Sequence, residues 1–397
     1  MNTQEIIAMQ KQYVMPTHAP GLALVRGEGC KVWDADGKKY LDFLGGLAVI
    51  SVGHGHPKLA KAIGDQAAKL MHVSNLFYNE NQPMLAKKIV EKFGEGKVFF
   101  CNSGAEANEG LIKLARYWGH AAGKYEIISM RNSFHGRTMA TLTATGQFKV
   151  QKGFDPLPGG FVYANFNDIK SVREAITERT VAIITEVIQA EGGVLPADPE
   201  FMRQLRALCD EKNILLLIDE VQTGIGRTGN WFGFQGYGVK PDAISLAKGL
   251  GGGFPIGAIV ASAKYQDTFS VGSHATTFGG TPLACAAGLA VIQIMDEENL
   301  IENSRKRGTQ LKAGLEQIAA KYPWIKSVRG AGLIVGMVLD QPAKELEKLL
   351  TAKGLLTIAT ADKVIRFLPP LTVSESEVNA ALAIVGSACA EFKPAAA

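Results

Sequence analysis

Two ionisable residues follow apolar runs that are typical of buried strands. Asp219 ends the run 214–219, while Lys248 follows the run 242–247 and precedes four nearby glycines. A buried carboxylate needs a cation beside it, and a buried lysine loses its charge and becomes a nucleophile toward carbonyl groups. Each residue also has an ordinary interpretation, Asp219 as a buried cap or metal ligand and Lys248 as a loop lysine reaching solvent.

The segment Ser103-Gly104-Ala105-Glu106 begins a helical pattern directly after a strand-like run. Free N–H groups at a helix N-terminus bind phosphate, and Gly104 lets the backbone approach a ligand closely. Ser103 and Glu106 also have the spacing of a capping box, so these residues alone favour an ordinary helix start.

Aromatic, basic and hydroxyl side chains occur in two further loops. Phe134 and His135 can stack on a flat ring, and Arg137 can bind a carboxylate through two hydrogen bonds. Thr276 and Thr277 offer hydroxyl groups for a phosphate. In chain order, the segments supply a phosphate cradle, a stacking ring, a partner for a protonated pyridine nitrogen and an imine-forming amine. They predict a site for pyridoxal 5′-phosphate.

The elements that must position these residues alternate along the chain. Helical patterns separate several of the candidate strands, which are 97–101, 125–130, 180–186, 214–219, 242–247 and 255–261. Such alternation is typical of an α/β fold with a mainly parallel sheet covered on both faces. We expect a large domain over 57–285, a smaller α+β domain over 286–397, and an N-terminal segment, 1–56, beside the smaller domain.

The smaller domain is expected to combine long helices with few strands. Its candidate helices are 300–320, 342–353 and 374–392, and its strand-like runs are 327–339, 355–359 and 364–368. We expect the terminal residues 393–397 to be frayed.

Composition excludes several classes of protein. The chain has 397 residues, and 42 Lys and Arg against 38 Asp and Glu give a net charge of +4, which is too dispersed for nucleic-acid binding. Its five cysteines lack a C-x-x-C pair and predict reduced thiols in the cytoplasm, with no zinc site. The longest aliphatic run, 214–218, falls short of the roughly 20 residues of a membrane helix, so we expect no membrane partner.

Three motifs suggest other functions. The sequence 224–229 matches G-x-G-x-x-G, but five residues separate it from its strand and no helical pattern follows, which disfavours a nicotinamide dinucleotide. The run 215–220 resembles an ATPase magnesium site, yet no Gly-Lys pair is followed by Ser or Thr. His54 and His56 lack a nearby third ligand and favour a turn over a metal site.

The whole chain resembles the class III aminotransferases, pyridoxal-phosphate enzymes of fold type I. The resemblance is carried by FFCNSGAEANE, FHGRT, DEVQTGIGRTG, SLAKGLGGGFPIGA, TTFGGTPLACAA and VIRFLPPLTVS. It implies a seven-stranded, mainly parallel sheet in the large domain and a homodimer with shared active sites. Lys248 would form the Schiff base with the cofactor and move a proton, and Asp219 would pair with the pyridinium nitrogen. The other implied cofactor-binding residues are Ser103, Gly104, Ala105, Phe134, His135, Glu186, Val221, Gln222 and Thr277, the last acting from the neighbouring subunit.

The resemblance also implies how substrates bind. Arg137 and Arg366 would bind substrate carboxylates, with Thr276 nearby. Glu191 matches a glutamate that covers Arg366 while an ω-amino substrate is bound and swings away for glutamate. Such a movable carboxylate would neutralise Arg366 whenever no substrate carboxylate does so.

Leu47 bears on substrate choice. Ornithine δ-aminotransferases carry there a tyrosine that helps to bind the free amino acid end, and an apolar residue suits an acylated amine better. The resemblance therefore implies transfer of the δ-amino group of N-acetylornithine to 2-oxoglutarate, in arginine biosynthesis. Other class III substrates stay open, namely N-succinyldiaminopimelate, succinylornithine, 4-aminobutyrate, ornithine and lysine. So do a nicotinamide-dependent dehydrogenase and a non-catalytic protein of this fold.

Overall fold

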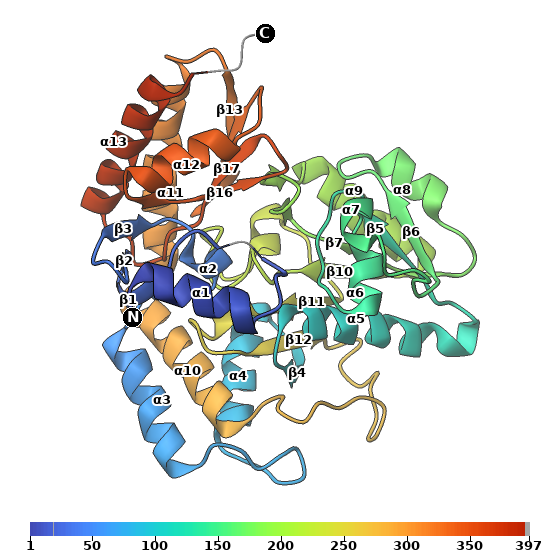
Figure 1. Cartoon of the computed structure of the whole chain (residues 1–397). Helices are drawn as coiled ribbons and strands as arrows, with labels where there is room; N and C mark the ends of the chain where they lie inside the picture. The colour runs from blue at the N-terminus through green and yellow to red at the C-terminus, as the bar shows by residue number, and fades with distance from the viewer. Residues whose placement is uncertain (19, 394–397) are drawn as a thin grey trace.

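A seven-stranded sheet forms the centre of the computed structural model, which describes residues 1–18 and 20–393. The strand order is β4-β12-β11-β10-β7-β5-β6 (Figure 1). Only β12 runs antiparallel to its neighbours, which confirms the mainly parallel sheet. The strands are β4 (Gly96–Cys101), β5 (Glu126–Met130), β6 (Phe161–Ala164), β7 (Thr180–Thr185), β10 (Leu215–Asp219), β11 (Ala243–Leu246) and β12 (Gly257–Ser262).

Both faces of this sheet are covered because side chains alternate along each strand. In β10, Leu215 and Leu217 pack into the cluster that contains the apolar residues of α5 (Gly104–Gly119). Leu216 and Ile218 pack into the opposite cluster, which contains those of α9 (Pro199–Lys212). All five residues of β10 are buried, so the strand reads as one apolar run and its position was predictable.

The strand β6 was missed by the sequence pattern. Its four residues are all apolar or aromatic, but the run is short, lies at the edge of the sheet and leaves three residues only half-buried. The capping box predicted for 103–106 was also wrong in one half. Ser103 Oγ accepts from the Glu106 N–H at 3.2 Å, but the Glu106 carboxylate accepts from the backbone N–H of Asn102 at 2.7 Å.

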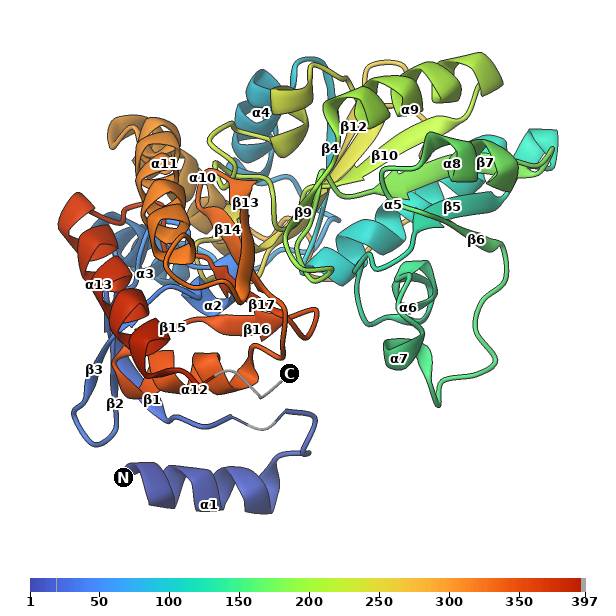
Figure 2. The same ribbon diagram turned by 90° about the horizontal axis from the view of Figure 1, so that it is seen from above.

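A second, antiparallel sheet of order β13-β14-β17-β16 lies beside the central one (Figure 2). Helices α11 (Leu300–Ala319), α12 (Lys344–Ala352) and α13 (Glu375–Glu391) accompany it. Its strands are β13 (Ile325–Ala331), β14 (Ile334–Leu339), β16 (Ile358–Thr360) and β17 (Val364–Phe367). The run 327–339 is therefore a hairpin and not one strand, with Gly332 at its turn in the left-handed region, φ 53°.

The N-terminal strands pair with the C-terminal part of the chain. A third sheet has the order β1-β2-β3-β15, and β15 runs parallel to β3. Its strands are β1 (Leu24–Glu28), β2 (Lys31–Asp34), β3 (Lys39–Asp42) and β15 (Leu355–Leu356). Helix α1 (Thr3–Tyr13) lies outside with no buried residue (Figure 2).

The boundary predicted at 285/286 falls inside the continuous helix α10 (Pro282–Glu297), which packs against α3 (Pro57–Lys69) and α4 (Asn81–Phe93). The division into domains stays a prediction, and the tail predicted to fray lies, from residue 394 on, outside the described residues. Within the described ranges, no helix is long and apolar enough to cross a membrane. The remaining elements are α2 (Gly45–Ala48), α6 (Met139–Ala144), α7 (Phe148–Gln151), α8 (Ile169–Ala175), β8 (Ile188–Gln189) and β9 (Leu195–Pro196).

Candidate active site

A cavity of about 430 Å³ lies where the carboxyl ends of the central strands meet. Segments that follow β4, β5, β7, β10 and β11 all contribute to its wall. Twelve of the residues predicted from sequence line it: Ser103, Gly104, Ala105, Phe134, His135, Arg137, Glu186, Glu191, Asp219, Val221, Gln222 and Lys248. The topology thus gathers residues that lie far apart along the chain.

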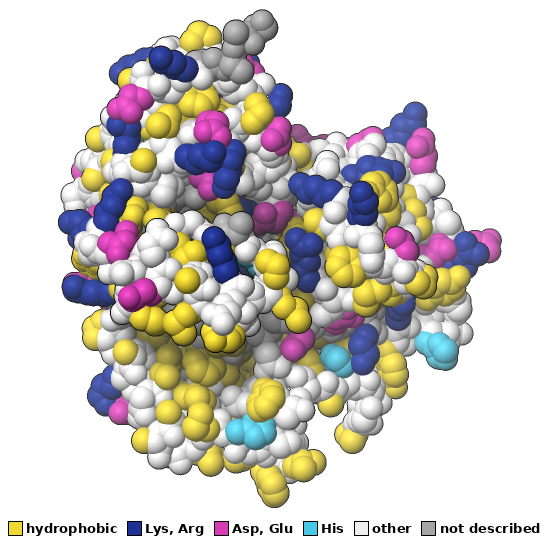
Figure 3. All heavy atoms as spheres, viewed as in Figure 1, with side chains coloured by type: hydrophobic (Ala, Val, Ile, Leu, Met, Phe, Trp, Pro, Cys, Tyr) yellow, Lys and Arg dark blue, Asp and Glu magenta, His cyan; other side chains and the backbone are white. Residues whose placement is uncertain are grey.

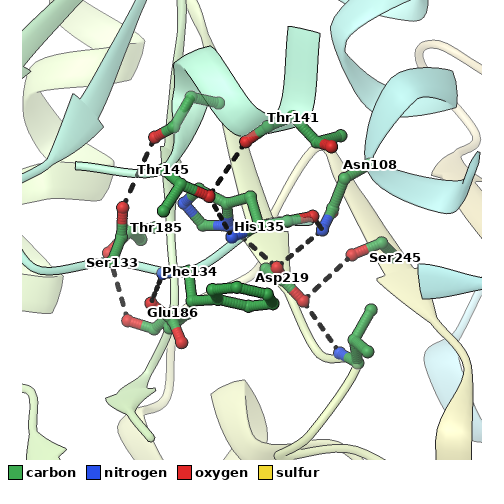
Figure 4. Close-up of polar contacts among 12 residues, drawn as sticks. Asn108, Ser133, Phe134, His135, Thr141, Thr145, Thr185, Glu186, Asp219 and Ser245 are labelled. Carbon is green, nitrogen blue, oxygen red and sulfur yellow. Dashed lines mark hydrogen bonds and ion pairs between the residues drawn. The ribbon is translucent and has the colours of Figure 1, made fainter. Parts of the chain in front are cut away.

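Asp219 is buried at the end of β10 and held by four donors (Figure 4). Its Oδ2 accepts from Asn108 Nδ2 at 2.7 Å and lies 2.8 Å from His135 Nδ1. Its Oδ1 accepts from the Val221 N–H at 3.0 Å and from Ser245 Oγ at 3.4 Å. These contacts fix the orientation of the carboxylate, which suits a partner for a pyridinium nitrogen.

Asn108 was missed by sequence reasoning. It lies on the buried face of α5, between the apolar positions Ala107 and Leu111, and donates to both Asp219 and the backbone oxygen of His135. A polar residue on an apolar helix face was the available signal. His135, which the sequence offered as a possible stacking residue, instead directs its ring nitrogen at Asp219.

Lys248 follows β11 with a left-handed backbone, φ 45°, an uncommon conformation for a residue with a side chain. Burial lowers the pKa of its amine to about 8, although the negative charge of Glu191 acts to raise it. A substantial fraction of the amine is therefore neutral near physiological pH, as attack on a carbonyl requires. Such strained backbone is typical of functional sites.

The helix start at Ser103 provides donors for an anion. The backbone N–H groups of Gly104 and Ala105 have no acceptor among the described residues. Gly104 has a second reason to be glycine, because a Cβ there would lie 2.7 Å from Val221 Cγ1. The free donors fit a phosphate group, and the absence of a Cβ lets Val221 pack against the same turn.

Glu186 is a buried carboxyl group behind Phe134. Burial, with a further contribution from the charge of Asp219, raises its pKa well above the ordinary value. One oxygen accepts from the Phe134 N–H at 3.2 Å, which ties the aromatic loop to the end of β7 (Figure 4). The shift favours the protonated form of Glu186, which reduces the negative charge beside Asp219.

Arg366, on β17, is fully buried and forms an ion pair with Glu191 at 2.8 Å. Its Nη1 also donates to Gln222 Oε1 at 3.2 Å, whereas its Nε and Nη2 have no partner among the described residues. Burial acts to raise the pKa of Glu191, but Arg366, Lys248 and Lys149 together outweigh it, so the pKa is lowered. Arg366 itself does not line the cavity, although Glu191 and Gln222, which contact it, do.

The remaining predicted residues lie at or beyond the mouth of the cavity. Arg137 is exposed, with its guanidinium carbon 5.4 Å from the centre of the Phe134 ring. Thr276 accepts from Asn102 at 3.0 Å, and Thr277 is exposed; neither lines the cavity. Val49 is a lining residue whereas Leu47, on which the substrate prediction drew, is 37% exposed and does not line it.

Two of the motifs that suggested other functions have structural contacts. His54 lies 2.7 Å from a carboxylate oxygen of Asp42, and His56 lies 3.0 Å from one of Glu298. Arg227, within the glycine-rich segment 224–229, is buried and donates to the backbone oxygen of Leu333 at 3.0 Å. These contacts join segments that are distant in the sequence.

Comparison with known proteins places the chain in a family. Residues 13–389 match the family model for aminotransferase class III. The chain belongs to the class III aminotransferases. It is 49% identical to an acetylornithine aminotransferase from Caldanaerobacter subterraneus subsp. tengcongensis, over 98% of this chain and 100% of that protein. It is 45% identical to a succinylornithine transaminase from Yersinia pseudotuberculosis, over 94% and 93%.

A solved structure of ornithine aminotransferase from Toxoplasma gondii, with partial occupancy of PLP at its active site, superposes with a TM-score of 0.93. It is 32% identical and covers 97% of this chain and 94% of that chain. Pyridoxal 5′-phosphate is the cofactor of this aminotransferase, and the residues present fit it, with free N–H groups at Gly104 and Ala105 and a buried Asp219. When bound, the cofactor withdraws electrons from the substrate carbon that carries the amine.

Proposed function

We propose that this aminotransferase moves the δ-amino group of N-acetylornithine to 2-oxoglutarate, producing N-acetylglutamate 5-semialdehyde and glutamate for arginine biosynthesis. The ion pair between Glu191 and Arg366, near Lys248, carries the proposal. With the pair closed, the charge of Arg366 is neutralised; with the pair open, Arg366 can bind a substrate carboxylate. The acetylornithine aminotransferase that is 49% identical over nearly the full chain supports the choice of substrate.

The chain's own residues divide the chemical work. The Lys248 amine holds the cofactor and then takes a proton from the amine-bearing carbon and returns it. Asp219 would face the ring nitrogen of the cofactor, and its four donors fix the carboxylate in position to do so. Gly104 and Ala105 would hold the phosphate group of the cofactor through their N–H groups, and Phe134 and Val221 would pack against its ring.

Arg366 exchanges its carboxylate partner between the two half-reactions. While the amine donor is bound, Glu191 pairs with Arg366, and the donor's own carboxylate binds Arg137 at the mouth. When glutamate binds, its α-carboxylate replaces Glu191 on Arg366, whose Nε and Nη2 are free to donate. A buried guanidinium is costly without an anion, so one carboxylate or the other occupies it in each half of the reaction.

Succinylornithine is a second candidate donor. The support is the succinylornithine transaminase that is 45% identical over 94% of this chain. Both acylated donors have an uncharged α-nitrogen, and they differ in one additional carboxylate on the succinyl group. A panel of donors containing acetylornithine, succinylornithine, N-succinyldiaminopimelate, ornithine, lysine and 4-aminobutyrate separates them by kcat/KM.

The test of the cofactor role uses borohydride reduction of the holoenzyme followed by peptide mass mapping. The pyridoxyl mass should lie on Lys248, and a mark on another lysine would contradict the proposal. The Lys248→Ala variant should fold, with an unchanged circular dichroism spectrum, and lose turnover. Full activity in this variant would also contradict it.

We further propose a homodimer with shared active sites and a cytoplasmic location. Exposed apolar side chains at Leu76, Phe77 and Tyr78 lie near Phe278, since Asn75 donates to the backbone of Gly279 at 3.1 Å. Hydrophobic side chains gather at the lower end of the face seen in Figure 3. The five buried free cysteines support a reducing compartment.

Mixing two inactive variants tests the dimer. In a hybrid of Lys248→Ala and Thr277→Ala subunits, one site combines an intact Lys248 with an intact Thr277 from the other subunit. Activity should therefore return on mixing under conditions of subunit exchange. Sedimentation velocity should show twice the chain mass, and a monomer with full activity would contradict the proposal.

A further inference from the structure

The turn that carries Glu191 has an unusual backbone. It joins β8 to β9, and within it Gly193 has φ 99° and Val194 has φ 55°. A left-handed φ is strongly disfavoured for a β-branched residue such as Val194. A backbone of this kind persists only where the surrounding structure over-determines it, and such positions cluster at ligand clamps and switches.

The strands of the antiparallel sheet hold this turn. Arg329 on β13 donates from Nε and Nη2 to the backbone oxygen of Gly193, at 3.0 and 2.7 Å. Thr360 on β16 donates from Oγ1 to the backbone oxygen of Glu191 at 2.9 Å. β13 also lies beside β9, as Figure 2 shows. The sheet that contains Arg366 therefore also fixes the turn that bears its carboxylate partner.

Packing leaves the turn little freedom to shift. Val194 is fully buried, and a Cβ on Gly336 of β14 would lie 2.9 Å from the Val194 Cβ. On the opposite side, a Cβ on Gly192 would lie 2.9 Å from the backbone oxygen of Asn132. The turn is thus enclosed by both sheets, while the Glu191 side chain extends toward Arg366.

Arg329 makes no ion pair among the described residues, although it is half-buried. The planar guanidinium of an arginine is well suited to a carboxylate partner. Both of its hydrogen bonds are instead made to one backbone oxygen of the Glu191 turn. The two hydrogen bonds of Arg329 therefore hold the backbone of that turn in place.

We propose that Arg329 is a positioning residue for Glu191. It fixes the backbone of the turn, so that the carboxylate reaches or leaves Arg366 by side-chain rotation alone. The proposal rests on the proposed function, in which Glu191 covers Arg366 for the amine donor and uncovers it for glutamate. Without Arg329 the turn relaxes from its left-handed conformation, and the Glu191 carboxylate covers Arg366 less often. The amine donor then binds less well, whereas the binding of glutamate is not weakened.

The experiment measures the two half-reactions separately on the holoenzyme, by the absorbance of the cofactor. The Arg329→Met variant removes the donors but keeps most of the side-chain length. It should raise the KM for acetylornithine by about fivefold to tenfold, the effect of losing an ordinary hydrogen bond, and leave the KM for glutamate unchanged or lower. The Arg329→Lys variant should restore part of the difference, because an ammonium can reach the same oxygen.

Lys326→Met is the matched control, since Lys326 lies on the same strand and pairs with Asp340 at the surface. It should change neither KM. Equal changes in both half-reactions of Arg329→Met, no change, or a change for glutamate alone would overturn the proposal. If Arg329→Met does not fold, Thr360→Val removes the other hydrogen bond without a change of shape and must show the same selective shift.

The wild-type protein separates this inference from the proposed function. If another ω-amino donor of the panel replaces acetylornithine, the ratio of the two KM values is measured with that donor. If no ω-amino donor reacts, the proposed function and the inference both fail. If both half-reactions occur and the variants leave their ratio unchanged, the inference alone fails.

Discussion

His135 Nδ1 lies 2.8 Å from Asp219 Oδ2, and both side chains are buried. Because the carboxylate accepts, Nδ1 carries the proton of this ring. The other ring nitrogen, Nε2, has no partner among the described residues. The histidine therefore serves to orient Asp219, together with Asn108, which donates to the same carboxylate oxygen.

Replacing His135 with phenylalanine should weaken catalysis without removing it. A flat ring is kept, although a slightly larger one, but Asp219 loses one of four donors, and a hydrogen bond to a charged group contributes about 1.5–3 kcal/mol. We expect kcat/KM to fall by about tenfold to a hundredfold. Asp219→Asn should cost more, since it removes the charge itself. Steady-state kinetics checks both, with the exposed His120→Phe as a control that should behave as wild type.

The pKa of Lys248 predicts how the cofactor-free enzyme reacts with pyridoxal phosphate. Below about pH 8 the amine is protonated and cannot attack the aldehyde, so the rate of incorporation should rise with pH and level off above about 8. Stopped-flow absorbance across a pH series measures this midpoint. Because the charge of Glu191 raises the pKa of Lys248, Glu191→Gln should move the midpoint to lower pH. A wild-type midpoint near the usual lysine value of 10.5 would contradict the assignment.

Sequence pattern was sufficient for every strand of the central sheet except β6, which lies at one of its edges. β10 is apolar throughout because both of its faces are covered, so its end at Asp219 could be located to the residue. β6 was missed although its residues are apolar or aromatic, because so short a run does not distinguish a strand from other buried segments. The hairpin of β13 and β14 was read as one strand, because apolar residues continue on both sides of Gly332.

Some residues of the candidate site could likewise be found from the sequence, and others could not. Asp219 and Lys248 could be found from their type and their place after a strand, since parallel strands bring such positions together. Asn108, Arg329 and Thr360 could not be assigned their roles, because their hydrogen-bond partners are set by the tertiary fold. Local sequence contains no trace of such a pairing.

Arg366→Gln should separate the two substrates. Glutamate loses the guanidinium for its α-carboxylate, and truncating one partner of a buried charged pair costs about 2–5 kcal/mol. We therefore expect the KM for glutamate to rise by at least about thirtyfold. The amine donor binds while Arg366 is covered by Glu191, so its KM should change far less. Half-reaction kinetics tests this, and equal losses for both substrates would show that Arg366 has only a structural role.

Gly104→Ala should destabilise the helix start by overpacking. The new Cβ would lie 2.7 Å from Val221 Cγ1, and forcing extra atoms into a packed site costs about 1–3 kcal/mol. Urea unfolding should show a lower free energy of unfolding, and cofactor affinity should fall because the adjacent N–H donors shift. In the double variant Gly104→Ala with Val221→Ala, the methyl group has room and much of the stability should return. If Val221→Ala and Gly104→Ala are instead additive, contact between these two residues is not the cause, because a relieved clash must appear as coupling between the two substitutions.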